Sequence, residues 1–207
     1  MANLLETAHL LSFSIFAFVA AFTPGPNNVM LAASGANFGL RRTLPHIFGI
    51  CAGFLCMVVA ASFGLTSMFS ALPQLLVLFK IAGGIFIVYL AWKIATAAPQ
   101  QDKPQVSQPL SFTAAALFQL INPKAVIVII SAISTYASAS ASPLHATILI
   151  TSIFAIVTIL STLLWGYAGE ILGGVLKQRN HLRIFNAVMA CLLLVTLLPV
   201  ITDNLFG

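Results

Sequence analysis

Charged side chains are scarce in this sequence. Only 6% of its 207 residues are Asp, Glu, Lys or Arg, whereas 60% are hydrophobic, and an ordinary soluble domain carries about 25% charged residues. A soluble protein with so few charges could not cover its surface with polar groups. The composition therefore excludes a soluble globular domain and predicts an all-α integral membrane protein.

Acidic residues and cysteines are also few. The four acids lie near predicted helix ends or in a polar linker, and the three cysteines lie within apolar runs. Neither set provides a disulfide framework or converging metal ligands, so we expect no cofactor and no metal site. The net charge of +5 does not predict a nucleic-acid partner, because the sequence has no basic cluster with interleaved aromatic residues.

Long apolar runs make up most of the chain. A membrane-spanning helix needs about 20 apolar residues, and six runs reach that length. The first run has no basic segment or cleavage site before it, so we expect it to be retained as a span. Thr43 and Ser142 are predicted N-caps, each with a proline in the following turn. The predicted spans are 8–33, 43–70, 73–97, 111–138, 142–172 and 180–203.

A polar segment with several prolines, 98–110, separates two halves, 1–97 and 111–207, with three predicted spans each. The second half must then enter the membrane from the opposite side, which predicts two inverted repeats. Basic residues gather in and beside the loops that follow the first, third and fifth spans, which predicts that these loops are cytoplasmic and both termini are periplasmic. These residues are Arg41, Arg42, Lys93, Lys103, Lys177, Arg179 and Arg183.

Helix-breaking residues interrupt the first span of each half. The sequence "TPGPNN" occupies 23–28, and "NPK" occupies 122–124. Proline removes a helical hydrogen bond, and both breaks are expected near the middle of the bilayer. The N–H groups freed at a helix start suit a carboxylate, and the C=O groups freed at a helix end suit an ammonium group. The two breaks therefore predict a binding site for a zwitterionic amino acid.

Lys124 is the strongest single candidate, because a charge at mid-membrane costs about 2.5–3.5 kcal/mol on insertion scales. Ser131 and Thr135 share its helical face and extend the predicted pathway. A face of the fifth span carries Thr147, Thr151, Thr158 and Thr162, which serves either helix packing or pathway lining. The predicted substrate-binding residues are Pro24, Gly25, Pro26, Asn27, Asn28, Asn122, Pro123, Lys124, Ser131 and Thr135.

Glycines spaced four residues apart occur in three predicted spans or at their ends. Small residues at this spacing let helices approach closely in a membrane. We therefore expect tight helix contacts at three pairs, Gly35 and Gly39, Gly49 and Gly53, and Gly169 and Gly173.

These motifs resemble those of the LysE/RhtB family of bacterial amino-acid exporters. The resemblance covers nearly the whole chain and is closest to the branch that exports cysteine, O-acetylserine or other small neutral amino acids. It implies six spans, an inner-membrane location and efflux coupled to protons. Many members carry Asp where this chain has Asn27, which favours a neutral substrate and leaves the coupling residue open. The motifs are "FTPGPNN", "GLRR", "VYLAWKIAT" and "INPKA".

Other function classes stay open at this point. They are a transporter or channel for another small solute and a membrane partner subunit that transports nothing. An enzyme is not expected, because the sequence lacks a nucleophile, base or metal set. The expected partners are an amino-acid substrate, protons and the lipid bilayer, and a homo-oligomer is allowed.

Overall fold

Helices form every regular element in the part of the chain that the structure describes. The computed structural model describes residues 2–65, 73–96, 108–137, 143–175 and 179–197, which confirms the predicted all-α class. The helices are α1 (Ala2–Phe22), α2 (Pro26–Phe38), α3 (Leu40–Ala60), α5 (Pro73–Ala95), α6 (Phe112–Ile121), α7 (Pro123–Ala132), α8 (Pro143–Val175) and α9 (Arg179–Val195), with π-helical turns η1 (Ala61–Leu65) and η2 (Ile133–Ala137).

Two helices are long and apolar enough to cross a membrane without interruption, Leu40–Gly64 and Leu144–Val175. Two further segments qualify as bent pairs: His9–Phe22 with Pro26–Phe38, bent by 49°, and Phe112–Ile121 with Pro123–Tyr136, bent by 64°. Both helix breaks expected from the sequence are thus confirmed in the backbone. Ile81–Ala95 and Asn180–Val195 are shorter apolar helices, so the count of six spans stays a prediction.

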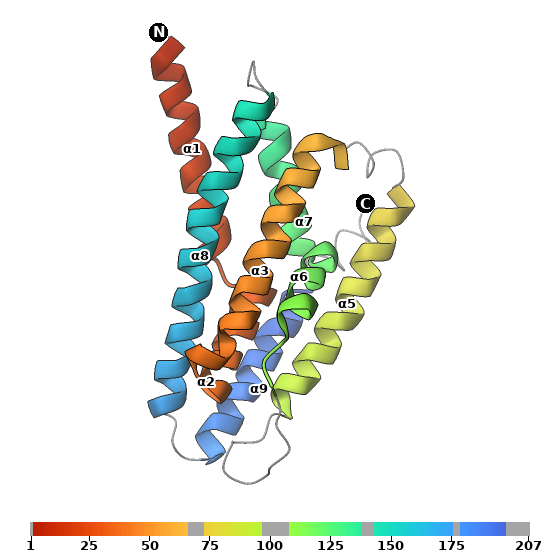
Figure 1. Ribbon diagram of the computed structural model, residues 1–207. Coiled ribbons are helices and arrows are strands. Elements are labelled where there is room, and N and C mark those ends of the chain that lie inside the picture. The colour runs from red at the N-terminus through yellow and green to blue at the C-terminus, as the bar shows by residue number, and fades with distance from the viewer. Residues whose placement is uncertain (1, 66–72, 97–107, 138–142, 176–178, 198–207) are drawn as a thin grey trace.

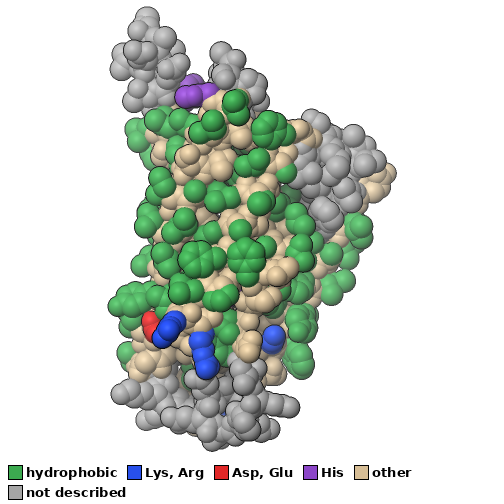
Figure 2. All heavy atoms as spheres, viewed as in Figure 1, with side chains coloured by type: hydrophobic (Ala, Val, Ile, Leu, Met, Phe, Trp, Pro, Cys, Tyr) green, Lys and Arg blue, Asp and Glu red, His purple; other side chains and the backbone are tan. Residues whose placement is uncertain are grey.

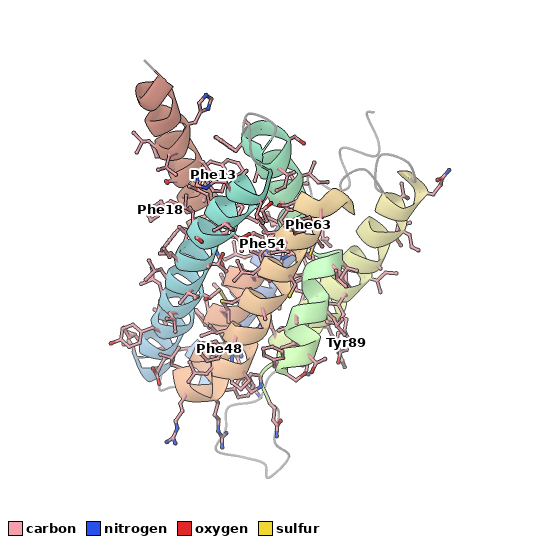
Figure 3. The ribbon with its side chains drawn as sticks, turned by 45° about the horizontal axis from the view of Figure 1, so that its top comes forward. Phe13, Phe18, Phe48, Phe54, Phe63 and Tyr89 are labelled. Carbon is pink, nitrogen blue, oxygen red and sulfur yellow. The ribbon has the colours of Figure 1, made fainter. Side chains whose placement is uncertain are left out.

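The surface matches a membrane environment. Hydrophobic side chains cover the middle of the face seen in Figure 2, and Lys and Arg side chains gather near its lower end. Phe18, Phe48, Phe63 and Tyr89 are 46–71% exposed, as expected for rings that face lipid (Figure 3). The longest described helix, α8, packs against both α1 and α2 (Figure 1).

Aromatic rings form much of the core that α1, α3 and α8 share. Phe154 of α8 lies between Phe13 of α1 and Phe54 of α3, with ring centroids 5.1 and 5.2 Å apart and edge-to-face geometry in both pairs. A second apolar cluster joins α2, α5, α6 and α9 through residues such as Val29, Ile87, Phe118 and Leu193. These two clusters hold the broken helices against the continuous ones.

Glycines set the closest helix contacts. A Cβ at Gly35 of α2 would collide with the carbonyl oxygen of Gly166, and one at Gly169 of α8 would collide with that of Ala32. Between α3 and α6, a Cβ at Gly53 would meet the Ala116 carbonyl oxygen. The predicted close packing is confirmed at these glycines and at Gly49 and Gly173.

The start of α3 differs from the sequence prediction. The predicted N-cap, Thr43, lies inside the helix, where its buried hydroxyl donates to the Gly39 carbonyl at 2.8 Å. The residue at the cap position is Gly39, with φ 78° and ψ 161°, a conformation that is essentially restricted to glycine. Because Gly39 reverses the chain directly after α2, the next helix begins at Leu40 and Pro45 lies within it. Gly39 therefore shapes a turn, and it also lies close to α8, because a Cβ there would be 3.2 Å from Glu170 Oε1.

Other boundaries agree to within a few residues. The first span continues to Phe38 instead of ending at residue 33. Ser111 is the N-cap of α6, and its hydroxyl accepts a hydrogen bond from the Ala114 N–H at 3.2 Å. The predicted N-cap Ser142, residues 98–107 of the linker and the end of the last predicted span lie outside the described residues.

We expect Gly169→Val to destabilise the protein by about 1–3 kcal/mol, because the side chain would force α8 away from the α2 backbone. The matched control is Gly174→Val in the same helix, where an added Cβ meets no atom within 4 Å. Thermal unfolding of the purified proteins in detergent measures the difference. Equal midpoints for the two variants would contradict the proposed contact between the α2 and α8 backbones.

Candidate functional site

A cavity of about 60 Å³ lies where the two helix breaks meet. This volume suits a few water molecules or a small solute, and it is far below the several hundred Å³ of a drug-sized site. One side is apolar, with Ile50, Phe54, Val128 and Phe154. The polar side chains that line it are Asn27, Asn28, Asn122, Lys124, Thr158, Ser161 and Thr162.

Prolines end α1 and start α2. Pro24 and Pro26 have no N–H to donate to the carbonyls of the preceding turn, so the last helical bond of α1 runs from the Thr23 N–H to the Val19 carbonyl at 2.9 Å. Gly25 is fully extended, and α2 restarts at Pro26. The carbonyl groups at the end of α1 must then find donors outside the helix.

Side chains from three helices satisfy the end of α1. The Asn28 amide donates to the carbonyl oxygens of Ala21 and Thr23 at 2.8 and 2.9 Å. The Ser161 hydroxyl of α8 also donates to Ala21, at 2.7 Å, and the Lys124 amine of α7 donates to Thr23 at 2.5 Å. The sequence predicts that these carbonyls would receive a ligand's ammonium group, but in this structure each already accepts two hydrogen bonds from side chains.

Lys124 reaches Thr23 by crossing over Gly25. A Cβ on Gly25 would lie 2.6 Å from Lys124 Cδ, closer than real Cβ contacts allow, and 3.0 Å from Nζ. The absence of a side chain at Gly25 is therefore what lets the lysine lie against the break. Lys124 is half-buried and forms part of the cavity wall.

The second break is held by an amide network. The side chains of Asn27 and Gln119 exchange two hydrogen bonds, at 2.8 and 3.1 Å, and so join the first break to the end of α6. Gln119 also donates to the Ala115 carbonyl at 3.0 Å and accepts from the Asn122 amide at 3.5 Å. Gln119 is completely buried, and its role was not predicted from the sequence although it lies one helical turn before Pro123.

Both resumed helices present their N-termini at the cavity. Pro26 and Pro123 occupy the first positions of α2 and α7, and neither helix has a side-chain cap. The first intrahelical bonds run from the Val29 and Val126 N–H groups, so the N–H groups before them have no helical partner. The partial positive charge of two helix starts adds to the charge of Lys124.

The structure brings part of the predicted site together. The predicted residues on the cavity wall are Gly25, Pro26, Asn27, Asn28, Asn122 and Lys124. Pro24 is exposed in the break, Pro123 is buried behind the wall, Ser131 is half-buried and Thr135 is exposed, and none of these lines the cavity. A role in substrate binding stays a prediction for the whole set.

Helix α8 contributes a polar wall that the sequence left undecided. Thr158 and Thr162 line the cavity, whereas Thr147 and Thr151 do not. Ser161, between them, was missed, although it lies one residue from the threonine face. The feature that marks Ser161 is its hydrogen bond to the Ala21 carbonyl of α1. That contact cannot be predicted from the periodicity of α8 alone.

Acidic and imidazole groups are absent from the described cavity wall. Across the part of the chain that is described, no three His, Cys, Asp or Glu residues lie together as metal ligands. The ionisable group that the described wall offers is the Lys124 amine. The arrangement can therefore bind an anionic group, and it has no carboxylate to pair with a cationic side chain.

Comparisons with known proteins agree with this geometry. A family model described as "LysE type translocator" matches residues 18–202. The cysteine/O-acetylserine efflux protein of Escherichia coli strain K12 is 29% identical over 185 residues, covering 89% of this chain and 93% of that protein. The protein of the same name from E. coli O139:H28 is 29% identical over 186 residues, with the same coverage, and that of Shigella flexneri serotype 5b is 29% identical over 185 residues.

No solved structure matches the chain. The family match, by contrast, extends over most of its length, including both helix breaks and every described helix after α1. Members of this family are transporters, which confirms the expectation that the chain is not an enzyme. The chain belongs to the LysE type translocator family, as the sequence motifs predicted, and is a multi-pass membrane transporter.

Proposed function

We propose that this transporter exports small neutral amino acids or their derivatives, of the cysteine, O-acetylserine and homoserine or threonine type, from the cytoplasm across the bacterial inner membrane. The observation that carries the proposal is the Lys124 amine beside two uncapped helix starts in a small cavity. The relatives named cysteine/O-acetylserine efflux protein support the same substrate class.

Lys124 is the proposed carboxylate ligand because it can leave its present partner at little cost. The Thr23 carbonyl accepts hydrogen bonds from both Lys124 and Asn28. If Lys124 turns to a substrate, Asn28 still satisfies that carbonyl, so no buried acceptor is orphaned. A carboxylate gains a charge-assisted hydrogen bond from the amine and the field of the helix starts.

The described wall also favours a small, uncharged side chain. A lysine or arginine substrate would bring a second positive charge toward Lys124 with no carboxylate among the described lining residues to receive it. The side chains of Ile50, Phe54 and Phe154 instead provide an apolar surface. A channel or a carrier of metal ions would need a different wall, with continuous water access or converging hard ligands.

The proposed architecture is six spans in two inverted repeats, 1–97 and 111–207, joined by the cytoplasmic linker 98–110. Each half starts with a broken helix whose second segment begins with proline. The broken helix of the first half packs on α8 and that of the second half packs on α3, while α5 and α9 pack on each other. The first span of each half thus packs on the second span of the other half, and the two third spans pack on each other. Two halves related by a pseudo-twofold axis are expected to pack in this way.

The proposed orientation puts the basic end in the cytoplasm and both termini in the periplasm. Arg41 and Arg42 begin α3, and Lys93 is in the last turn of α5. Figure 2 shows Lys and Arg side chains gathered near one end of the molecule, as the positive-inside rule requires. Labelling of Lys103→Cys from the periplasmic side of intact cells would contradict this orientation.

Proton antiport is the proposed coupling mode. Export of a zwitterion moves no net charge, so an inward proton gradient can drive it only if protons and substrate alternate in the transporter. An efflux rate that does not change with an imposed pH gradient would contradict antiport. It would not contradict the proposal that the protein exchanges amino acids.

Lys124→Met should reduce amino-acid exchange at least about tenfold, because a charged hydrogen bond is worth about 1.5–3 kcal/mol and 1.4 kcal/mol is a factor of ten. Counterflow of labelled serine, cysteine, threonine, leucine or lysine into liposomes loaded with the same compound measures the exchange. The control is Lys93→Met, at the basic end of α5 and away from the cavity, which should exchange normally.

The outcomes of this assay are distinct. Counterflow of the small neutral amino acids, lost in Lys124→Met, supports the proposal. Counterflow of lysine alone would refute the neutral substrate class. Folded protein that exchanges none of them would favour the channel or partner-subunit alternatives.

Gly25→Ala should weaken exchange about threefold to tenfold by displacing Lys124 from the break, since a hydrogen bond contributes about 0.5–1.5 kcal/mol. The backbone of Gly25 is extended, so alanine causes no strain of its own. In a Lys124→Met background, the same substitution should have almost no further effect, because the lysine it displaces is gone. Additive losses in the double variant would show that Gly25 acts independently of Lys124.

A further inference from the structure

Asn122 has an acceptor that no described group satisfies. Its side chain is 2% exposed, lies in the cavity wall between Gln119 and Lys124, and has an Oδ1 atom without a hydrogen-bond partner among the described residues. Buried side-chain acceptors are almost always paired in native proteins. An unpaired acceptor at a transporter's cavity therefore calls for a donor that is present only when substrate is bound.

The orientation of the Asn122 amide follows from its neighbours. Gln119 is one helical turn beyond Ala115, whose backbone carbonyl can only accept hydrogen bonds, so the group 3.0 Å from it must be the Gln119 amino group. The Gln119 carbonyl then faces Asn122, and the group of Asn122 directed toward it must be the amino group, at 3.5 Å. The remaining group of Asn122 is its carbonyl oxygen, Oδ1.

Several acceptors at the breaks are already occupied. The Ala21 and Thr23 carbonyls each receive two side-chain donors, and the Asn27 carbonyl receives the Gln119 amide. Asn122 differs from these three in having a side-chain oxygen that is both buried and without a partner among the described residues. Asn122 is also two residues from Lys124, at the same helix start. The ammonium and carboxylate groups of an α-amino acid are attached to the same carbon, so their two ligands must lie close together.

We infer that Asn122 Oδ1 accepts a hydrogen bond from the substrate's ammonium group while Lys124 binds its carboxylate. The inference rests on the proposed function and narrows it: the transporter requires a protonated amine and rejects carboxylic acids that lack one. Gln119 is the positioning residue, because its bond to the Ala115 carbonyl fixes which end of the Asn122 amide is free.

Two substrates that differ at one group test the inference. Serine and 3-hydroxypropionate are identical except that hydrogen replaces the ammonium group. With the membrane potential clamped at zero, counterflow of each compound gives its KM. A site built to bind a polar group discriminates strongly against the analogue without it, so the wild-type transporter should prefer serine by about 100-fold or more.

Asn122→Leu should raise the KM for serine at least about tenfold and leave that for 3-hydroxypropionate unchanged, so that the preference collapses. Asn122→Asp retains an oxygen acceptor and should keep the preference. The control is Asn186→Leu, which removes a completely buried amide of the Asn37–Asn186 pair, away from the cavity wall. It should leave the ratio of the two KM values unchanged even if it lowers stability.

Each outcome either supports or overturns the role of Asn122 in binding the ammonium group. An unchanged ratio in Asn122→Leu, or a wild-type transporter that takes both compounds equally well, would overturn the role of Asn122 while amino-acid export stands. If Asn122→Leu does not fold, the inference is tested by Asn122→Asp alone. A preference for serine that is present in the wild type and retained in Asn122→Asp supports the inference, and a preference that is lost in Asn122→Asp refutes it. Absence of serine counterflow in the wild type would overturn both the inference and the proposed neutral amino-acid export.

Discussion

Backbone groups freed inside an apolar bundle must find partners, and this requirement determines the centre of the molecule. Each backbone group left unpaired in the interior of a membrane costs several kcal/mol. The carbonyls at the end of α1 receive donors from α2, α7 and α8. Polar side chains on three helices are thus explained by one interruption of the chain, and the positions of those helices follow from the contacts they make with it.

The two kinds of freed group are treated differently. The Ala21 and Thr23 carbonyls at the end of α1 are satisfied within the protein, whereas the N–H groups that begin α2 and α7 have no side-chain cap. The centre therefore has a net capacity for negative groups, which Lys124 reinforces. This polarity would be lost if the breaks were simple kinks, because a kinked helix keeps most of its hydrogen bonds.

The sequence was informative where local chemistry decides the structure. Pro24, Pro26 and Pro123 remove helical hydrogen bonds locally, so both breaks and the residues beside them could be predicted, as could the contact glycines of α3 and α8. Gln119 and Ser161 could not, because their roles depend on which helices become neighbours: the hydrogen bond from Ser161 to Ala21 joins residues 140 positions apart. The start of α3 was misplaced because Thr43 resembles a cap, whereas the conformation of Gly39 places the turn before it.

The contact between α2 and α8 is made largely by backbone atoms, since Gly35, Gly169 and Gly173 lie directly against carbonyl groups of the facing helix. Helices that interlock through large side chains must change rotamers before they can shift past one another. Two nearly smooth helical surfaces have no such barrier to sliding or rotation. The contact with α8 thus holds α2 tightly in the direction that separates the two helices, and by itself gives little resistance to movement along α8.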